Sequence, residues 1–226
     1  MNNIILSIMS AIYKTIRRHR KPSGIDFNYQ FQYDRLKYLQ ELDFPDWTRY
    51  FFIVQGVIIS QLKIVLEIGT GCEIVKNCLQ PIVERYVTMD VNSRLTPDIL
   101  ADMREFRPEL KNRFDCIIIA EVLEHIPFAE VEMACKNLLV YLVPSGKVFV
   151  TTPHQRYAAL FVISTIEPYV FTIPRSKTPI DPSHHWEIGD GKIKQKQLES
   201  IFESVGFKIE QHEKLLRGDF WVLVKV

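Results

Sequence analysis

The sequence lacks the cysteine and histidine patterns that mark structural metal sites. Its cysteines, Cys72, Cys78, Cys116 and Cys135, form no Cys-x-x-Cys pair, and no histidine cluster has zinc-finger spacing. We therefore expect reduced cysteines within a core and no metal ion. An excess of positive charge is also absent, because the formal net charge is +1. This balance excludes a domain that binds nucleic acid through overall basicity.

The 226 residues contain no internal repeat, no low-complexity segment and no Gly/Ser linker. Residues 3–16 are apolar but too few to span a bilayer, and the basic run 17–21 follows them, the reverse of a secretory signal. This order predicts a short amphipathic helix that caps the domain or covers an active site. Contact of residues 1–21 with an anionic membrane surface is the alternative. We expect a cytoplasmic protein without stable membrane insertion.

The first 60 residues predict an N-terminal helical extension, or lid. Apolar positions recur near helical spacing within residues 31–42 and again within 47–58, and Pro45 separates the two runs.

From residue 61 onwards the pattern predicts one α/β domain. Continuous apolar runs at 63–68, 85–91, 114–120 and 147–152 are typical of strands buried on both faces, and helical patterns lie between them. Such alternation predicts a mostly parallel sheet with helices on both faces. The final helix, about 195–205, precedes runs at 207–213 and 219–226 whose connection is too short for a crossover helix. These two strands should therefore form an antiparallel hairpin at the sheet edge.

A glycine turn follows the first predicted strand, in the run Glu67-Ile68-Gly69-Thr70-Gly71. Gly69 and Gly71 allow the backbone to turn sharply and to approach a ligand that the next helix meets with its N-terminal amides. A third glycine is expected two residues later, but Glu73 occupies that position. A carboxylate there would repel a pyrophosphate, whereas it is compatible with a cationic ligand.

Two further acids stand where a nucleoside would need them. Asp90 ends the second strand, where a carboxylate can accept hydrogen bonds from both ribose hydroxyls. Asp102 lies in the run PDILADM, from which a side chain could reach an adenine amine. Capping or loop roles are the alternatives for both residues.

The runs LEIGTG, MDVN, PDILAD and FDCIIIAEVLEHIPF occur in the order and spacing of the class I S-adenosylmethionine (AdoMet)-dependent methyltransferases. Over residues 60–226 the chain resembles this family, and most of all its type 11 and type 23 group. The resemblance implies a Rossmann-like α/β fold: a seven-stranded, mostly parallel sheet with an antiparallel last strand and helices on both faces. It also implies AdoMet as the cofactor, with S-adenosylhomocysteine as its product.

The resemblance further implies a set of cofactor-binding residues. They are Glu67, Gly69, Thr70, Gly71, Asp90, Val91, Asp102, Met103, Ala120 and Glu121. In this family Gly69 and Gly71 would line the methionine and ribose part of AdoMet. Asp90 would bind the ribose diol and Asp102 the adenine edge. Glu67 would organise the loop and the methionine amino group.

The acceptor side is expected in two places. His125 follows the fourth strand of the family fold, and His184 and His185 lie in a long irregular segment, 153–191, predicted to be a substrate-loop insertion. Histidine can remove a proton from a hydroxyl or amine near neutral pH, so these three are the candidate catalytic residues. The alternative is a packed loop anchored by Trp186, in which the histidines only form hydrogen bonds and Glu124 and His125 start a helix.

The expected reaction is methyl transfer to an O or N nucleophile of a small-molecule or glycan acceptor. The motifs of DNA amino- and cytosine-C5-methyltransferases are missing, so DNA is not expected as a partner. A protein or RNA acceptor docked by residues 17–21 is one alternative. A non-catalytic AdoMet-binding scaffold is another, because of Glu73. An NAD-linked reductase and a metal-assisted, catechol-type reaction are less favoured.

Overall fold

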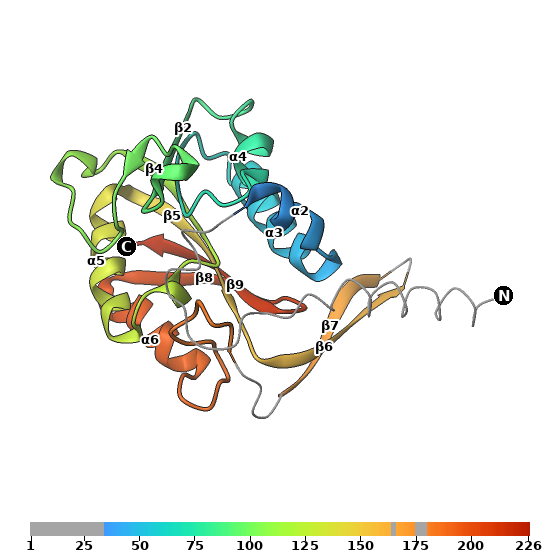
Figure 1. The fold of residues 1–226 in the computed structure, drawn as a ribbon. Helices are drawn as coiled ribbons and strands as arrows, with labels where there is room; N and C mark the ends of the chain where they lie inside the picture. Colours follow the sequence, from blue (N-terminus) through green and yellow to red (C-terminus); the bar gives the residue numbers. More distant parts are fainter. Residues whose placement is uncertain (1–33, 164–165, 175–179) are drawn as a thin grey trace.

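The computed structural model describes residues 34–163, 166–174 and 180–226 (Figure 1). The predicted helix at 3–16 and the basic run 17–21 lie outside these residues. None of the helices in the described ranges is long and apolar enough to cross a membrane.

A seven-stranded sheet forms the centre of the molecule, in the order β3-β2-β1-β4-β5-β9-β8. All neighbours from β3 to β5 are parallel, and β9 is antiparallel to both β5 and β8. The mostly parallel sheet with an antiparallel last strand is thereby confirmed. The strands are β1 (Ile64–Ile68), β2 (Arg85–Asp90), β3 (Ile99–Leu100), β4 (Phe114–Ala120), β5 (Leu142–Pro153), β8 (Phe207–Lys214) and β9 (Gly218–Lys225).

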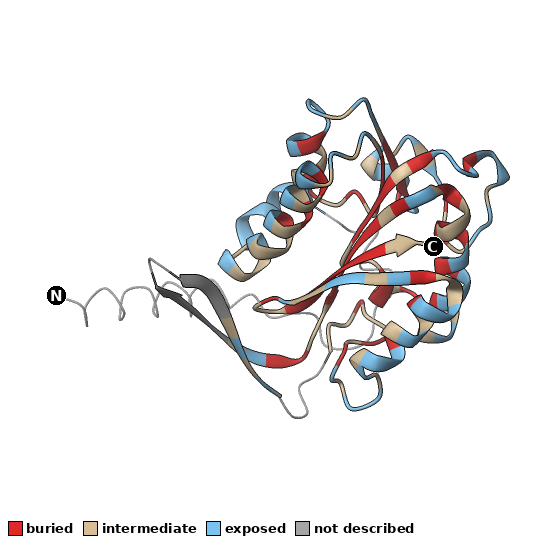
Figure 2. Cartoon of the chain, turned by 180° about the vertical axis from the view of Figure 1, so that it is seen from behind, coloured by how far each residue is buried: buried red, intermediate tan, exposed pale blue. Residues whose placement is uncertain are grey.

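Helices cover both faces of the sheet (Figure 1). Successive residues of a strand point to opposite faces, so Leu66 and Val65 belong to different hydrophobic clusters. The cluster of Leu66 includes residues of α5 (Val131–Tyr141) and α6 (Gln195–Val205). The cluster of Val65 includes residues of α3 (Phe44–Ile59) and α4 (Ile74–Leu79). Figure 2 shows the buried residues concentrated along the strands between the helical layers.

The two helices that precede the sheet have clear start signals. Asp34 caps α2 (Arg35–Glu41) by accepting from the backbone N–H of Lys37. Asp43 and Asp46 form a reciprocal capping box at the start of α3. Pro45, expected to separate two helices, stands in the first turn of α3, where its missing N–H has no intrahelical role.

Residues 153–191 are not irregular throughout, which corrects the sequence-based prediction. They contain an antiparallel hairpin, β6 (Arg156–Ile163) and β7 (Ile166–Pro174), which forms a second sheet. The hairpin projects from the body of the molecule (Figure 1). Continuous apolar residues in the first strand and two prolines in the second concealed the alternation that predicts such strands.

The base of this hairpin is tied to β9 by a buried carboxylate. The side chain of Asp219 is fully buried and accepts hydrogen bonds from His154, from Arg156 at 3.0 Å and from His212 at 2.9 Å. Burial would raise the pKa of Asp219, but the hydrogen bonds from the histidines and the nearby Arg156 hold it well below its usual range.

Candidate active site

A cavity of about 510 Å³ opens at the carboxyl ends of β1, β2 and β4, where open α/β sheets bind their ligands. All the predicted cofactor-binding residues line it, namely Glu67, Gly69, Thr70, Gly71, Asp90, Val91, Asp102, Met103, Ala120 and Glu121. His125 lines it as well. Residues of α2, including Lys37 and Tyr38, also line the cavity.

The glycine turn leaves space on its cavity side. Gly69 and Gly71 have φ angles of +78° and +43°, in the region that favours glycine. A Cβ on Gly69 would lie 2.3 Å from Cγ2 of Val122, so the turn packs tightly there. A Cβ on Gly71 would meet no atom closer than the carbonyl oxygen of Gly69, at 4.0 Å. The backbone at Gly71 is therefore open to a ligand.

Glu73 takes the left-handed conformation that a glycine would favour, with φ of +59°, at the start of α4. Its carboxylate forms ion pairs with Arg35 of α2 at 2.8 Å and with Lys76 at 3.2 Å. Among the described residues it is not part of the cavity lining. The departure from the glycine pattern therefore connects α2 to the glycine turn without placing a carboxylate in the cavity.

Asp90 is held in a fixed orientation at the end of β2. Its Oδ2 accepts from the backbone N–H of Thr70 at 3.0 Å, and its Oδ1 accepts from that of Asn92 at 2.8 Å. Burial raises the pKa of Asp90, and the hydrogen bonds from Asn92 and Thr70 oppose the rise. The same acid therefore stabilises the glycine turn and faces the cavity.

Asp102 is engaged by Arg104. Both of its carboxylate oxygens accept from the guanidinium, whose Nε lies 2.9 Å and 3.0 Å from them, and the backbone N–H of Arg104 also donates to Oδ1. The hydrogen bonds from Arg104 lower the pKa of Asp102. Asp102 therefore forms a local turn contact rather than a helix cap, and its side chain lines the cavity.

Glu67 is a buried carboxyl group at the end of β1, with 3% of the residue exposed. The hydroxyl of Tyr86 donates to its Oε2 at 2.9 Å. Burial raises the pKa of Glu67 to about 8, despite the hydrogen bond from Tyr86. A cationic group bound beside it would favour the ionised form.

Glu121 follows β4 and adopts a left-handed conformation, with φ of +56°. Such strain in a residue other than glycine is frequently found at functional sites. Burial raises the pKa of Glu121, and the positive charge of Arg49, 3.9 Å away, opposes the rise. Its carboxyl group lines the cavity beside His125.

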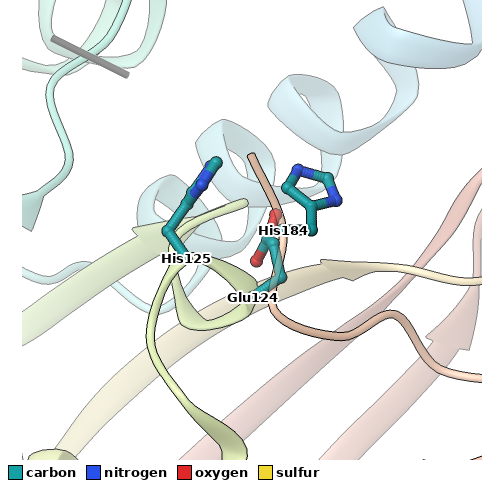
Figure 3. Close-up of side chains that lie close together, drawn as sticks. All are labelled: Glu124, His125 and His184. Atoms are coloured by element: carbon teal, nitrogen blue, oxygen red, sulfur yellow. The ribbon is translucent and has the colours of Figure 1, made fainter. Parts of the chain in front are cut away.

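Two of the three candidate histidines lie together. The rings of His125, in the short 3₁₀ helix η4 (Leu123–His125), and His184 are 4.8 Å apart between centroids and nearly perpendicular. Nδ1 of His125 lies 3.0 Å from the carbonyl oxygen of Ser183, and Nδ1 of His184 lies 2.8 Å from Oε1 of Glu187. Burial lowers the pKa of His125 to about 4, so its imidazole is neutral at pH 7. Figure 3 shows Glu124 between the two rings.

His185 lies apart from this pair. Its backbone N–H donates to the carbonyl oxygen of Glu124 at 2.8 Å, and within the described ranges its side chain does not line the cavity. Trp186 is 2% exposed and donates from Nε1 to the carbonyl oxygen of Ile126 at 3.0 Å. The expected anchoring role of Trp186 is therefore present in the structure.

Several residues of the site had no sequence signal of their own. Tyr38 and Tyr50 reach the cavity from helices that were predicted only as an extension, and Ser183 and Glu187 orient the histidines. The run Asp-Pro-Ser-His-His-Trp-Glu does contain polar groups on both sides of the histidine pair. This cluster of polar residues was the one feature of the sequence that pointed to Ser183 and Glu187 as partners of the histidines.

Comparisons with known proteins agree with the geometry. A family model described as "Methyltransferase domain" matches residues 45–212, and a comparison with curated proteins found no match. One similar solved structure is the N-methyltransferase NodS from Bradyrhizobium japonicum in complex with S-adenosylhomocysteine, with a TM-score of 0.62, 14% identity, and coverage of 88% of this chain and 96% of that one.

A second similar structure is the 1,6-didemethyltoxoflavin-N1-methyltransferase of Burkholderia thailandensis, with bound 1,6-didemethyltoxoflavin and S-adenosylhomocysteine. Its TM-score is 0.59 at 11% identity, covering 96% of this chain and 90% of that one. A third is an S-adenosylmethionine-dependent methyltransferase from Clostridium acetobutylicum, with a TM-score of 0.57, 13% identity, and coverage of 88% and 98%. At these identities the likeness concerns the fold.

Proposed function

Since the chain belongs to the class I AdoMet-dependent methyltransferase family, we propose that it methylates an oxygen or nitrogen nucleophile of a small-molecule or glycan acceptor. The observation that carries the proposal is a single cavity with two chemically different ends. Acids and the glycine turn line one end, and Glu121 and His125 line the other.

The first end fits AdoMet by its donor and acceptor chemistry. Asp90 faces the cavity with a carboxylate fixed by two backbone N–H groups, as binding of a ribose diol requires. Glu67 offers a buried carboxyl group to the methionine ammonium of the cofactor. Gly71 leaves room for the methionine part of the cofactor. Asp102 and the buried Met103 would border the adenine.

The second end would hold the acceptor. In AdoMet the methyl group is carried by a sulfonium sulfur, which makes S-adenosylhomocysteine a good leaving group. Positioning of the nucleophile therefore accounts for much of the barrier reduction. Glu121 and His125 would orient the nucleophile in line with the methyl group. When no metal ion is bound, the neutral imidazole of His125 can also accept the proton that an attacking hydroxyl or amine loses.

The small size of the acceptor is supported by what surrounds the cavity. Residues of α2 and of the segment 181–183 border the cavity and limit its volume to about 510 Å³, within the usual range of small-molecule sites. The Burkholderia thailandensis enzyme of similar fold has a bound small-molecule substrate. We assign α2 the role of a lid over this cavity.

Calorimetric titration with S-adenosylhomocysteine tests the cofactor end. We expect micromolar binding by the wild type and at least about 10-fold weaker binding by Asp90→Asn, because a hydrogen bond to a charged group contributes about 1.5–3 kcal/mol. Glu132→Gln is the matched control, since Glu132 is half exposed and pairs only with Lys136 among the described contacts. Equal affinity of the Asp90 variant and the wild type would contradict the assignment.

Turnover across a panel of small-molecule and glycan acceptors tests the acceptor end, with S-adenosylhomocysteine formation as the readout. Methylation of at least one acceptor class, lost in Glu121→Gln, would support the proposal. Cofactor binding without turnover on any acceptor would favour a non-catalytic scaffold.

A further inference from the structure

We propose that Glu124, His125 and His184 form a binding site for one divalent first-row transition-metal ion of the Zn²⁺ class, at the acceptor end of the cavity. One carboxylate oxygen and one nitrogen from each imidazole all lie within 4.8 Å of one another. The side chains come from η4 and from the loop that carries His184, and they gather in one place (Figure 3).

Glu124 gives the strongest indication of a cation site. The residue is 0% exposed, and neither of its carboxylate oxygens has a hydrogen-bond partner among the residues that the structure describes. A buried carboxyl group without a partner is strongly destabilising, and buried charges in proteins are paired or bind metals. A divalent ion between Glu124 and the two histidines would provide the partner that the described residues do not.

Both histidines are oriented as metal ligands usually are. The carbonyl oxygen of Ser183 can only accept a hydrogen bond, so Nδ1 of His125 carries a proton and donates it. Nδ1 of His184 likewise donates to the carboxylate of Glu187. In the neutral rings each Nε2 then carries the free lone pair. In metal-binding histidines, the ring nitrogen that does not bind the ion commonly donates a hydrogen bond to a carbonyl or carboxylate oxygen.

The ligand set favours a particular class of ion. Two imidazoles and one carboxylate suit Zn²⁺, Co²⁺, Mn²⁺ or Fe²⁺ better than Mg²⁺ or Ca²⁺, which prefer oxygen ligands. Metal–ligand distances are about 2.0–2.2 Å, so we expect the side chains to draw closer when the ion binds. The charge of Glu121 adds to the negative potential at Glu124, and that of Arg49 acts in the opposite direction.

Three protein ligands leave a coordination position open, as in catalytic rather than structural zinc sites. Since His125 lines the cavity, that position would face the acceptor. An acceptor oxygen bound there would be oriented and made more acidic. This last step rests on the proposed methyltransferase function, whereas binding of the ion does not.

Spectroscopic titration tests the site on the full chain after treatment with a chelator. Co²⁺ serves as the probe, because its visible absorption reports coordination by nitrogen and oxygen, and Zn²⁺ is then added as competitor. We expect one equivalent of Co²⁺ to bind and one equivalent of Zn²⁺ to displace it. Sub-stoichiometric binding, or an unchanged spectrum of octahedral aqueous Co²⁺, would overturn the proposal.

Substitutions distinguish the proposed metal ligands from neighbouring residues that do not bind the ion. Glu124→Gln and His184→Ala should weaken Co²⁺ binding by at least about 100-fold, and Glu187→Gln by about 10- to 100-fold, because it removes only an outer partner. His185→Ala is the matched control, as it removes the adjacent histidine and should bind like the wild type. Equal Co²⁺ affinity of His184→Ala and His185→Ala would refute the assignment.

S-adenosylhomocysteine binding to each variant distinguishes the two proposals. A variant that binds this product normally is folded, so failure of the wild type and of all variants to bind Co²⁺ would then reject the metal site alone. A wild type that binds Co²⁺ stoichiometrically but not S-adenosylhomocysteine would reject the proposed function and leave the metal site standing.

Discussion

The pKa of Glu67 makes cofactor binding depend on pH in a direction that can be predicted. Burial raises this pKa from 4.5 to about 8 in the folded protein. If Glu67 binds the methionine ammonium as a carboxylate, the protein must release a proton when the cofactor binds. Two pH units below the pKa only about 1% of the carboxyl groups are ionised, and at the pKa about half are. The association constant should therefore rise by about 50-fold between pH 6 and pH 8.

Calorimetric titration with S-adenosylhomocysteine at several pH values measures this dependence, and buffers of different ionisation enthalpy count the released proton. Glu67→Gln keeps an acceptor for the hydroxyl of Tyr86 but cannot ionise. It should bind weakly and with little pH dependence over the same range. A wild-type association constant that stays level from pH 6 to pH 8, or falls, would refute the reasoning.

The same shift affects the stability of the cofactor-free protein. Between pH 4.5 and about 8 the folded state retains a proton on Glu67 that the unfolded state loses. The contribution of this group is thus fully present below pH 4.5 and is lost as the pH rises to 8, by up to about 1.4 kcal/mol per pH unit. Urea unfolding of the wild type and Glu67→Gln at pH 5 and pH 8 would show the difference, and a gap that does not change with pH would contradict it.

Three further substitutions test other parts of the structure. Gly69→Ala should weaken S-adenosylhomocysteine binding at least about 10-fold, because its Cβ would lie 2.3 Å from Val122; if Gly69→Ala/Val122→Ala binds no better than the single variant, the clash is not the cause. Asp219→Asn should lower the free energy of unfolding, measured in urea at pH 7, by about 3 kcal/mol. This loss should shrink at acidic pH, where the wild-type carboxylate becomes protonated. A loss below about 1 kcal/mol would show that the buried network contributes little to stability. Trp186→Ala should cost about 3–5 kcal/mol in the same assay and Trp186→Phe less, and equal losses would place the effect in the indole hydrogen bond to Ile126 rather than in packing.

The fold was largely predictable because its signals are local. Buried parallel strands appear in the sequence as continuous apolar runs, and the glycine turn after β1 marks the ligand end of the sheet. The strand β3 has only two residues, Ile99 and Leu100, too few to form a pattern. The hairpin β6–β7 was missed because neither of its paired strands shows the alternation of apolar and polar residues that predicts a strand.

The residues expected to bind the cofactor could be found for the same reason, since each lies at or near the carboxyl end of a strand. The contact between His125 and His184 was not predictable, because it joins distant parts of the chain. His125 and His184 are 59 positions apart, yet their rings touch. Nothing in the pair His184-His185 indicates which ring turns toward His125, since adjacent residues of a loop point in directions that only tertiary packing decides. The cluster of Glu124, His125 and His184 was likewise not visible to a search for metal motifs at short spacing.

The ion pair between Glu73 and Arg35 has a consequence for the rate at which the product can leave. The arginine is 46% exposed, and a pair in that environment contributes at most about 1 kcal/mol and is screened by salt. In the proposed role of α2 as a lid, the pair would hold it over the cavity without making its opening slow. Because every catalytic cycle must exchange S-adenosylhomocysteine for AdoMet, a weak ion pair suits this position better than a strong one. The dissociation rate of the product should therefore increase with ionic strength.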